Sequence, residues 1–101
     1  MSIVVSALKE EQPHEKRVAI DPDVAKRLIK SGMKVLIEKG AGVASYYNDD
    51  SYKKAGAEVV DRKTALSQAN IVAVINLPSD ETLKALKSGQ VILGLLSSLI
   101  K

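Results

Sequence analysis

The sequence alternates short apolar runs, rich in Val and Ile, with segments in which apolar residues recur at helical spacing. Runs of this kind are typical of strands that are buried on both faces, as in a parallel sheet. Strands that alternate with helices are joined by crossover connections, which keep neighbouring strands parallel. We therefore expect an α/β fold with an open, mostly parallel five-stranded sheet of the flavodoxin-like kind, with helices on both faces. The expected strands cover residues 3–7, 34–38, 57–60, 71–75 and 91–96.

The segments between the expected strands carry start and stop signals of helices. Asp21 followed by Pro22 is typical of an N-cap and a first helical residue, because proline lacks the N–H that has no partner at that position. Gly32 is expected to end this helix in the left-handed conformation. The other expected helices run from Asn48 to Ala55-Gly56, from Asp61 or Thr64 to Gln68, and over residues 79–88, with Leu83 and Leu86 pointing inward.

Composition limits the kinds of site and partner. The chain has 101 residues, of which 46% are hydrophobic and 27% charged, as in one small domain. The formal charge of +3 comes from scattered Lys and Arg, and base-stacking aromatics are few, so we expect no nucleic-acid partner. The absence of Cys excludes zinc–thiolate sites, and the single His14 excludes a multi-His metal site, so no metal is expected. His14 has no nucleophile placed beside it by any motif, which leaves a catalytic triad without support.

The apolar end of the sequence bears on domain organisation. Residues 91–100 form its longest apolar run, which is shorter than the roughly 20 residues that a membrane span needs. We therefore expect no direct membrane insertion, and no signal peptide is visible. A parallel sheet is normally covered on both faces, and no covering helix follows this run. The sheet is thus expected to be incomplete at its C-terminal end, with residues 1–101 forming one N-terminal subdomain; a final helix starting near Ser97 is the alternative.

Polar side chains follow three of the expected strands. Arg17 lies in the loop after the first strand, Asn76 follows the fourth and Ser97 follows the fifth. Because ligands of open α/β sheets bind outside the carboxyl ends of the strands, we expect these three residues to line a ligand cleft. A guanidinium can hold a carboxylate or phosphate through two parallel hydrogen bonds. The alternatives are a surface Arg, an amide in a turn ahead of Pro78, and a serine in the core.

A glycine-rich loop after the second strand invites comparison with dinucleotide-binding sites. Gly40 and Gly42 have the spacing of the first two fingerprint glycines, and Asp61 lies at the distance of the acid that binds ribose. The third glycine is replaced by Ser45, however, and the fingerprint requires a long helix that starts at its second glycine. A helix cap at Asn48 follows here instead. We interpret the loop as a turn that requires glycine rather than as a dinucleotide site.

Two specific motifs and several weaker ones run through the whole chain. The specific motifs are Arg17-Val18-Ala19 and Glu38-x-Gly40-Ala41-Gly42. With them, the chain resembles the N-terminal part of alanine dehydrogenase and of the α subunit of proton-translocating NAD(P) transhydrogenase. The weaker matching blocks are Lys9-Glu10, Leu28-x-Lys30-x-Gly32, residues 52–60, residues 69–72, Asn76-x-Pro78 and Gly89-Gln90.

Departures from the family pattern favour one of its branches. Alanine dehydrogenases have a substrate-binding Lys where this chain has Asn76 and a catalytic His where it has Ser97. Transhydrogenase α subunits are more similar to this chain at Asn76 and also lack the His. The resemblance therefore implies a transhydrogenase α subunit in preference to an amino-acid dehydrogenase. Ser6 and Leu8 also depart from the family, which usually has Gly and Pro there.

The resemblance also implies what a complete protein would contain. It would transfer hydride from NADH to NADP⁺, coupled to proton translocation, with Arg17 near the nicotinamide as a cofactor-binding residue. The NAD-binding Rossmann domain lies downstream in such proteins, so these 101 residues alone are expected to be inactive and to bind no cofactor. The implied partners are the rest of the α subunit, a second α subunit in a homodimer, and the membrane and NADP-binding domains. The implied location is cytoplasmic, at the inner face of the membrane.

Two alternatives stay open at this point. An N-terminal part of an alanine-dehydrogenase-like amino-acid dehydrogenase would share the same fold. A non-catalytic α/β docking module, which binds a partner through the apolar residues 91–100, belongs to a different class.

Overall fold

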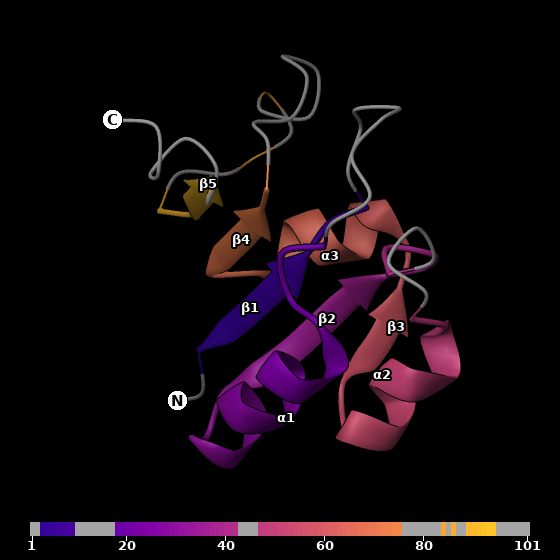
Figure 1. Ribbon diagram of the computed structural model, residues 1–101. Helices are drawn as coiled ribbons and strands as arrows, with labels where there is room; N and C mark the ends of the chain where they lie inside the picture. Colours follow the sequence, from indigo (N-terminus) through magenta and orange to yellow (C-terminus); the bar gives the residue numbers. More distant parts are fainter. Residues whose placement is uncertain are drawn as a thin grey trace.

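The computed structural model describes residues 3–9, 18–42, 47–75, 84, 86 and 89–94, and the side chains of these residues except 93 and 94. It contains a sheet of five strands that pair in parallel, with helices packed against it (Figure 1). The expected fold class is therefore confirmed. In chain order the elements are β1 (Val4–Ala7), α1 (Pro22–Lys30), β2 (Lys34–Glu38), α2 (Asp49–Ala55), β3 (Glu58–Val60), α3 (Arg62–Gln68), β4 (Ile71–Val74) and β5 (Val91–Gly94).

The strands lie in the order β3-β2-β1-β4-β5. This is the order of a Rossmann-type sheet, whereas flavodoxin has its second strand at one edge, in the order 2-1-3-4-5. The flavodoxin-like detail of the expected fold is thus wrong. Both orders arise from the same alternation of strands and helices. They differ only in whether the second crossover continues outward, as it does here from β2 to β3, or reverses across β1.

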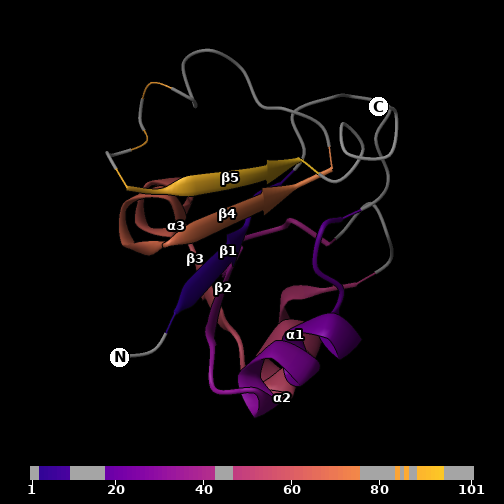
Figure 2. The same ribbon diagram turned by 90° about the vertical axis from the view of Figure 1, so that its left-hand side faces the viewer.

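The two faces of the sheet are covered by different helices, as Figure 2 shows. α1 and α2 lie on one face and contact each other, while α3 lies on the opposite face against β1 and β2. The strands alternate accordingly, since successive side chains point to opposite faces. In β1, Val5 and Ala7 join the cluster beneath α1 and α2, whereas Leu8, one residue beyond the strand, joins the cluster beneath α3. Both sides of the chain at β1 are therefore buried, and Ser6, the one polar residue of β1, is fully buried as well.

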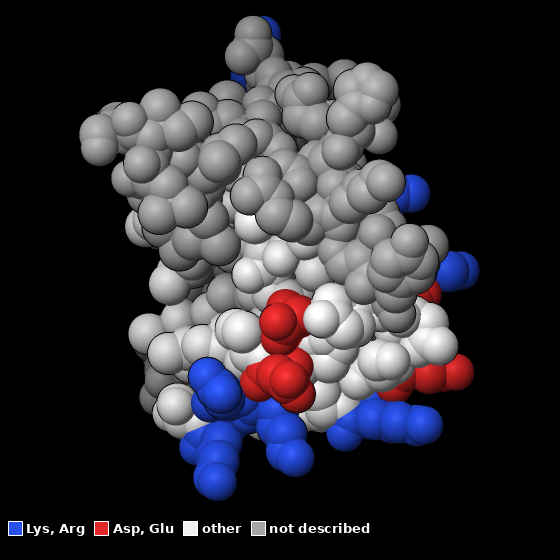
Figure 3. Space-filling model, in the orientation of Figure 1, with Lys and Arg blue, Asp and Glu red and all other residues white. Residues whose placement is uncertain are grey.

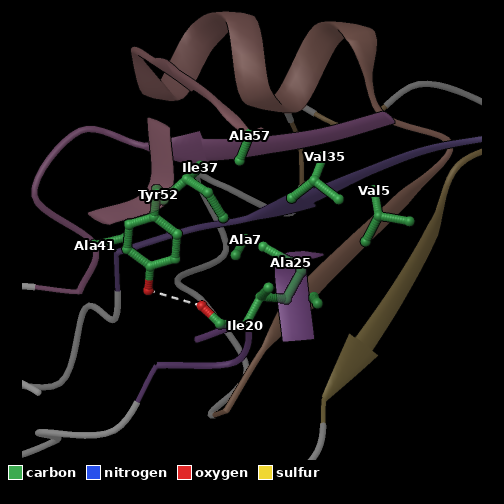
Figure 4. Close-up of a cluster of buried hydrophobic side chains, with 10 residues drawn as sticks. Val5, Ala7, Ile20, Ala25, Val35, Ile37, Ala41, Tyr52 and Ala57 are labelled. Carbon is green, nitrogen blue, oxygen red and sulfur yellow. Dashed lines mark hydrogen bonds between the residues drawn. The ribbon is translucent and has the colours of Figure 1, made fainter. Parts of the chain in front are cut away.

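The core beneath α1 and α2 is built from small and β-branched side chains around one aromatic ring (Figure 4). Ala25 of α1, Val35 and Ile37 of β2, and Tyr52 of α2 have no exposed surface. Alanines at the contact allow a helix to approach the sheet closely, and the Tyr52 ring fills the space toward the end of β2. The sequence has no Phe or Trp, so Tyr52 is the one aromatic side chain among the described residues of this cluster.

The helix ends confirm the expected caps. The carboxylates of Asp21 and Asp61 and the amide oxygen of Asn48 accept hydrogen bonds from the backbone N–H groups three residues on. Gly32, with φ of 97°, follows the first helix as expected. The expected helix over residues 79–88 lies largely outside the described residues. Within it, Leu86 packs against the cluster beneath α3, as expected, while Leu83 is not described.

Candidate functional site

The three residues expected to line a cleft lie outside the described residues. Arg17, Asn76 and Ser97 follow β1, β4 and β5, and these three strands are neighbours in the sheet. Their carboxyl ends are in register, with Ala7 beside Ala73 and Val74 beside Gly94. The strand order reverses between β1 and β4, which is where open α/β sheets bind ligands. A cleft formed by the three residues stays a prediction, and the strands that lead to them end side by side.

A carboxylate from β2 fixes the chain where it leaves β1. Oε1 of Glu38 accepts a hydrogen bond of 2.7 Å from the backbone N–H of Lys9, and Oε2 accepts one of 3.2 Å from Nε of Arg62. Nη2 of Arg62 lies 3.0 Å from Oε1 of Glu38 and donates a 2.7 Å hydrogen bond to the carbonyl oxygen of Lys9. Both polar groups of the Lys9 backbone are therefore held by side chains from β2 and α3.

Burial strengthens this arrangement, which we call the Glu38–Arg62 clamp. The side chains of Glu38 and Arg62 are 14% and 29% exposed. A guanidinium that meets a carboxylate through two nitrogens holds a defined orientation, and reduced exposure lowers the screening by water. The clamp thus sets the direction in which the chain leaves the sheet toward residues 10–17.

A tyrosine from α2 fixes the point at which the chain returns. The hydroxyl of Tyr52 donates a hydrogen bond of 2.7 Å to the backbone carbonyl of Ile20 (Figure 4). Tyr52 is fully buried, and burial raises its pKa above the ordinary value of 10, with a further contribution from the carboxylate of Asp21. The phenol stays protonated at neutral pH and remains a donor. The described residues on both sides of residues 10–17 are therefore anchored.

Sequence reasoning singled out neither Glu38 nor Tyr52 as positioning residues. Glu38 stands in the specific motif Glu38-x-Gly40-Ala41-Gly42, and Tyr52 opens one of the weaker matching blocks. Both positions match the family motifs. The backbone groups to which they are hydrogen-bonded, however, lie 29 and 32 residues away in the sequence. Spacing along the chain therefore gives no indication of what the two side chains bind.

The glycine-rich loop after β2 does not fit a dinucleotide in its described part. The N–H of Gly40 donates to the carboxylate of Asp49 at 3.0 Å. A Cβ atom at Gly42 would lie 2.7 Å from the ring of Tyr52, so this glycine makes room for a side chain of the core. The carboxylate of Asp61 caps α3, and its hydrogen bonds with Thr64 lower its pKa. The interpretation of this loop as a structural turn is thus supported.

Two departures from the family pattern are accommodated by the core. The hydroxyl of Ser6 is buried and donates a hydrogen bond of 2.7 Å to the backbone carbonyl of Ala65 in α3. Leu8 is 1% exposed and packs in the cluster beneath α3. Both side chains therefore serve the contact between β1 and α3.

Candidate metal sites and membrane spans are absent from the described ranges. Over residues 3–9, 18–42, 47–75 and the described positions from 84 to 94, no three His, Cys, Asp or Glu side chains gather where they could hold a metal ion. No helix in the same ranges has both the length and the apolar character needed to cross a bilayer.

The strand order indicates the class of domain to which this chain belongs. A parallel sheet in the order 3-2-1-4-5 is typical of Rossmann-like domains, which bind ligands where the strand order reverses. The family profile described as "Alanine dehydrogenase/PNT, N-terminal domain" matches residues 6–100. The chain therefore belongs to the family of alanine dehydrogenase/PNT N-terminal domains.

Relatives from both branches of the family are similar to the chain. Alanine dehydrogenase 1 of Staphylococcus aureus strain Mu50 is 34% identical over 94 residues, which is 93% of this chain and 25% of the relative. The crystal structure of a transhydrogenase from Sinorhizobium meliloti has a TM-score of 0.83 and 35% identity, covering 88% of this chain and 26% of that one. An L-alanine dehydrogenase has a TM-score of 0.84 and 28% identity, covering 89% and 25%. The chain thus spans about a quarter of the length of these relatives.

Proposed function

We propose that this chain is the N-terminal part of an NAD(P) transhydrogenase α subunit, whose complete complex transfers hydride from NADH to NADP⁺ coupled to proton translocation. Membership of the family and the dehydrogenase and transhydrogenase relatives support an oxidoreductase of the nicotinamide class. The finer assignment rests on Asn76 and Ser97, which stand where the resemblance to alanine dehydrogenase requires a substrate-binding Lys and a catalytic His.

The described structure supports a role as one wall of a cleft. Hydride chemistry belongs to the nicotinamide rings, and the protein around them contributes orientation and the exclusion of water. The Glu38–Arg62 clamp and the hydrogen bond from Tyr52 to Ile20 hold the two ends of the segment that carries Arg17. In this proposal Arg17 contacts the nicotinamide, and the dinucleotide is held by the Rossmann domain of the longer protein.

The proposed partners follow from the same assignment. They are the remainder of the α subunit, a second α subunit, and the membrane and NADP-binding domains of the complex, at the cytoplasmic face of the membrane. An alanine-dehydrogenase-like enzyme is the second candidate, because Staphylococcus aureus alanine dehydrogenase 1 is 34% identical to the chain. Identity alone does not separate the two, since the transhydrogenase structure stands at 35%.

Two activity assays on the protein encoded by the complete gene (the gene-length protein) distinguish the transhydrogenase from the alanine-dehydrogenase-like enzyme. We expect NADH-dependent reduction of an NADP⁺ analogue when the partner domains are present, and no oxidation of NADH with pyruvate and ammonia. Pyruvate- and ammonia-dependent turnover would overturn the proposal in favour of the amino-acid dehydrogenase. Absence of both activities, with a gene that ends at Lys101, would favour the docking module.

A further inference from the structure

Lys9 lies at the carboxyl edge of the sheet, two residues beyond the end of β1. Its side chain is exposed, whereas Leu8 before it is buried in the cluster beneath α3. β1 lies between β2 and β4, and the strand order reverses between β1 and β4. Open α/β sheets bind ligands at this point of the sheet. Lys9 therefore brings a positive charge to the edge at which a ligand is expected.

The helix ends explain several of the other described cations, but not Lys9. Figure 3 shows Lys and Arg side chains gathered along the lower edge of the molecule, where Figure 1 places the carboxyl ends of α1 and α2. The last turns of these two helices carry Arg27, Lys30, Lys53 and Lys54. Cations at these ends interact favourably with the helix dipoles. Lys9 belongs to no helix and lies at the opposite edge of the sheet, so its charge needs another explanation.

The charge of Lys9 is not neutralised by the carboxylate that approaches its backbone. The two oxygens of Glu38 bind the Lys9 N–H and the guanidinium of Arg62. Within the described part of the chain, the ammonium of Lys9 has no ion-pair or hydrogen-bond partner. The charges of Glu38 and Arg62 cancel, so the three side chains together keep a net positive charge. An anion at this edge of the sheet therefore meets a charge that no other described group has used.

The backbone of Lys9 is held more firmly than a solvated lysine requires. Its N–H donates to Oε1 of Glu38 at 2.7 Å, and its carbonyl oxygen accepts from Nη2 of Arg62, also at 2.7 Å. Side chains of β2 and α3 thus hold both polar backbone groups of one residue. A binding residue acts best when its surroundings fix its position, because less conformational freedom is then lost when the ligand binds. The clamp fulfils this condition for Lys9.

We propose that Lys9 binds an anionic group of the ligand, a phosphate or a carboxylate, and that Glu38 and Arg62 are its positioning residues. The lysine ammonium is a point charge with three donors, so it can bind either anion. The inference rests on the proposed function for its ligand. A phosphate would belong to a nicotinamide dinucleotide, and a carboxylate would belong to the substrate of an amino-acid dehydrogenase. Lys9 thus adds a described residue to the predicted ligand cleft.

Binding of two small anions to the gene-length protein tests the role of Lys9. The probes are ADP-ribose, which contains a pyrophosphate, and oxamate, a carboxylate that is added after NADH, and both are followed by isothermal titration. Lys9→Gln removes the charge, and Lys9→Arg retains it. Lys39→Gln is the matched control, because Lys39 is also exposed and directly follows β2, the neighbouring strand. Thermal denaturation of each variant verifies that it is folded.

We expect Lys9→Gln to raise the Kd of one of the two probes about 10- to 100-fold, as is typical when a hydrogen bond to a charged group is lost. Lys9→Arg should restore most of the affinity, and Lys39→Gln should change it less than about twofold, because distant exposed charges are screened. A rise for ADP-ribose identifies a phosphate, and a rise for oxamate identifies a carboxylate. No rise for either probe, an equal rise in Lys39→Gln, or a wild type that binds neither probe would overturn the proposal. Because binding is the readout, a protein that binds through Lys9 but transfers no hydride contradicts only the proposed function.

A double-mutant cycle tests the positioning role of the clamp. Arg62→Lys keeps the charge but loses the contact through two nitrogens with Glu38. We expect it to raise the Kd of the same probe about threefold or more in the wild-type background and to leave it unchanged when Lys9→Gln is present, since coupled residues are not additive. Equal effects in both backgrounds would show that Arg62 acts independently of Lys9 and would overturn the positioning role.

Discussion

At the scale of single residues, two polar side chains, the partly buried Glu38 and the fully buried Tyr52, fix where the first loop begins and ends. Glu38 and Tyr52 both bind backbone atoms far away in the sequence, at Lys9 and Ile20. Removing one partner of a buried hydrogen bond costs more free energy than the bond contributes net. The remaining partner is then left buried without a hydrogen bond to either protein or water. These two side chains are therefore sensitive probes of how the candidate cleft is held.

The Tyr52→Phe substitution removes only the hydroxyl that binds the carbonyl of Ile20. We expect the free energy of unfolding to fall by about 1–2 kcal/mol, measured by urea denaturation at pH 7. Because burial raises the pKa of Tyr52 in the folded state, the protonated phenol contributes stability that is complete below pH 10 and is lost as the pH rises further. The advantage of the wild type over the variant should thus shrink by about 1 kcal/mol at pH 11. Tyr47→Phe, at a residue that is 36% exposed, is the control and should change little.

The Glu38→Gln substitution tests the Glu38–Arg62 clamp. We expect a loss of about 1–3 kcal/mol in the free energy of unfolding, because the partly buried guanidinium of Arg62 loses the negative charge of Glu38. Glu58→Gln is the matched control, since Glu58 faces Lys34 at 3.8 Å with both side chains well exposed. An exposed pair of this kind contributes about 0–1 kcal/mol. Equal losses in the two variants, measured by urea denaturation, would show that the clamp adds nothing beyond a surface ion pair.

At the scale of elements, the sequence was sufficient to locate most helices and strands. The second strand was expected over residues 34–38 and is observed at Lys34–Glu38. The helix starts at Asp21 and Asn48 were predicted, and Asp61 was one of two starts expected for the third helix. The hydrogen bonds of these caps reach only three residues along the chain. Local signals of this kind are readable because both partners lie in one short segment.

The cap of α1 offers a test at this scale. We expect Asp21→Ala to lower the free energy of unfolding by about 1 kcal/mol, since the N–H of Val24 loses its acceptor. Asp23→Ala is the control, because Asp23 lies in the first turn and favours the helix dipole, which contributes about 0.3–1 kcal/mol. Thermal denaturation followed by circular dichroism compares the two. A larger loss for Asp23→Ala would contradict the assignment of Asp21 as the cap.

At the scale of the whole molecule, the order of the strands was the part that the sequence left undetermined. Alternating patterns identify strands but carry no information on which strand lies beside which, and the flavodoxin-like order was wrong for this reason. The residues of the candidate site show the same difference between local signals and contacts made across the fold. Arg17, Asn76 and Ser97 were proposed as candidates because they follow strands. The Glu38–Arg62 clamp joins β2, α3 and the backbone of Lys9 after β1, so it becomes visible only when the chain is folded.

A binding measurement tests the prediction that the chain is one wall of a cleft. Isothermal titration of the 101-residue chain with NADH should show no saturable binding, because the described part of the glycine-rich loop uses its donors and its space for internal contacts. The gene-length protein, titrated in parallel, should bind NADH. Tight binding by the short chain would contradict the prediction and would place a complete dinucleotide site within these residues.

The central position of β1 also has a consequence for synthesis. β1 lies between β2 and β4, and the backbone N–H of Val4 binds the side chain of Asn70, 66 residues later. While a ribosome is still translating the segment after β3, the nascent chain can pair β1 with β2 and β2 with β3, but the other side of β1 is an open edge. Unpaired strand edges recruit strands from other chains. A translation pause just before β4 emerges would therefore leave this side of β1 open to strands from other chains.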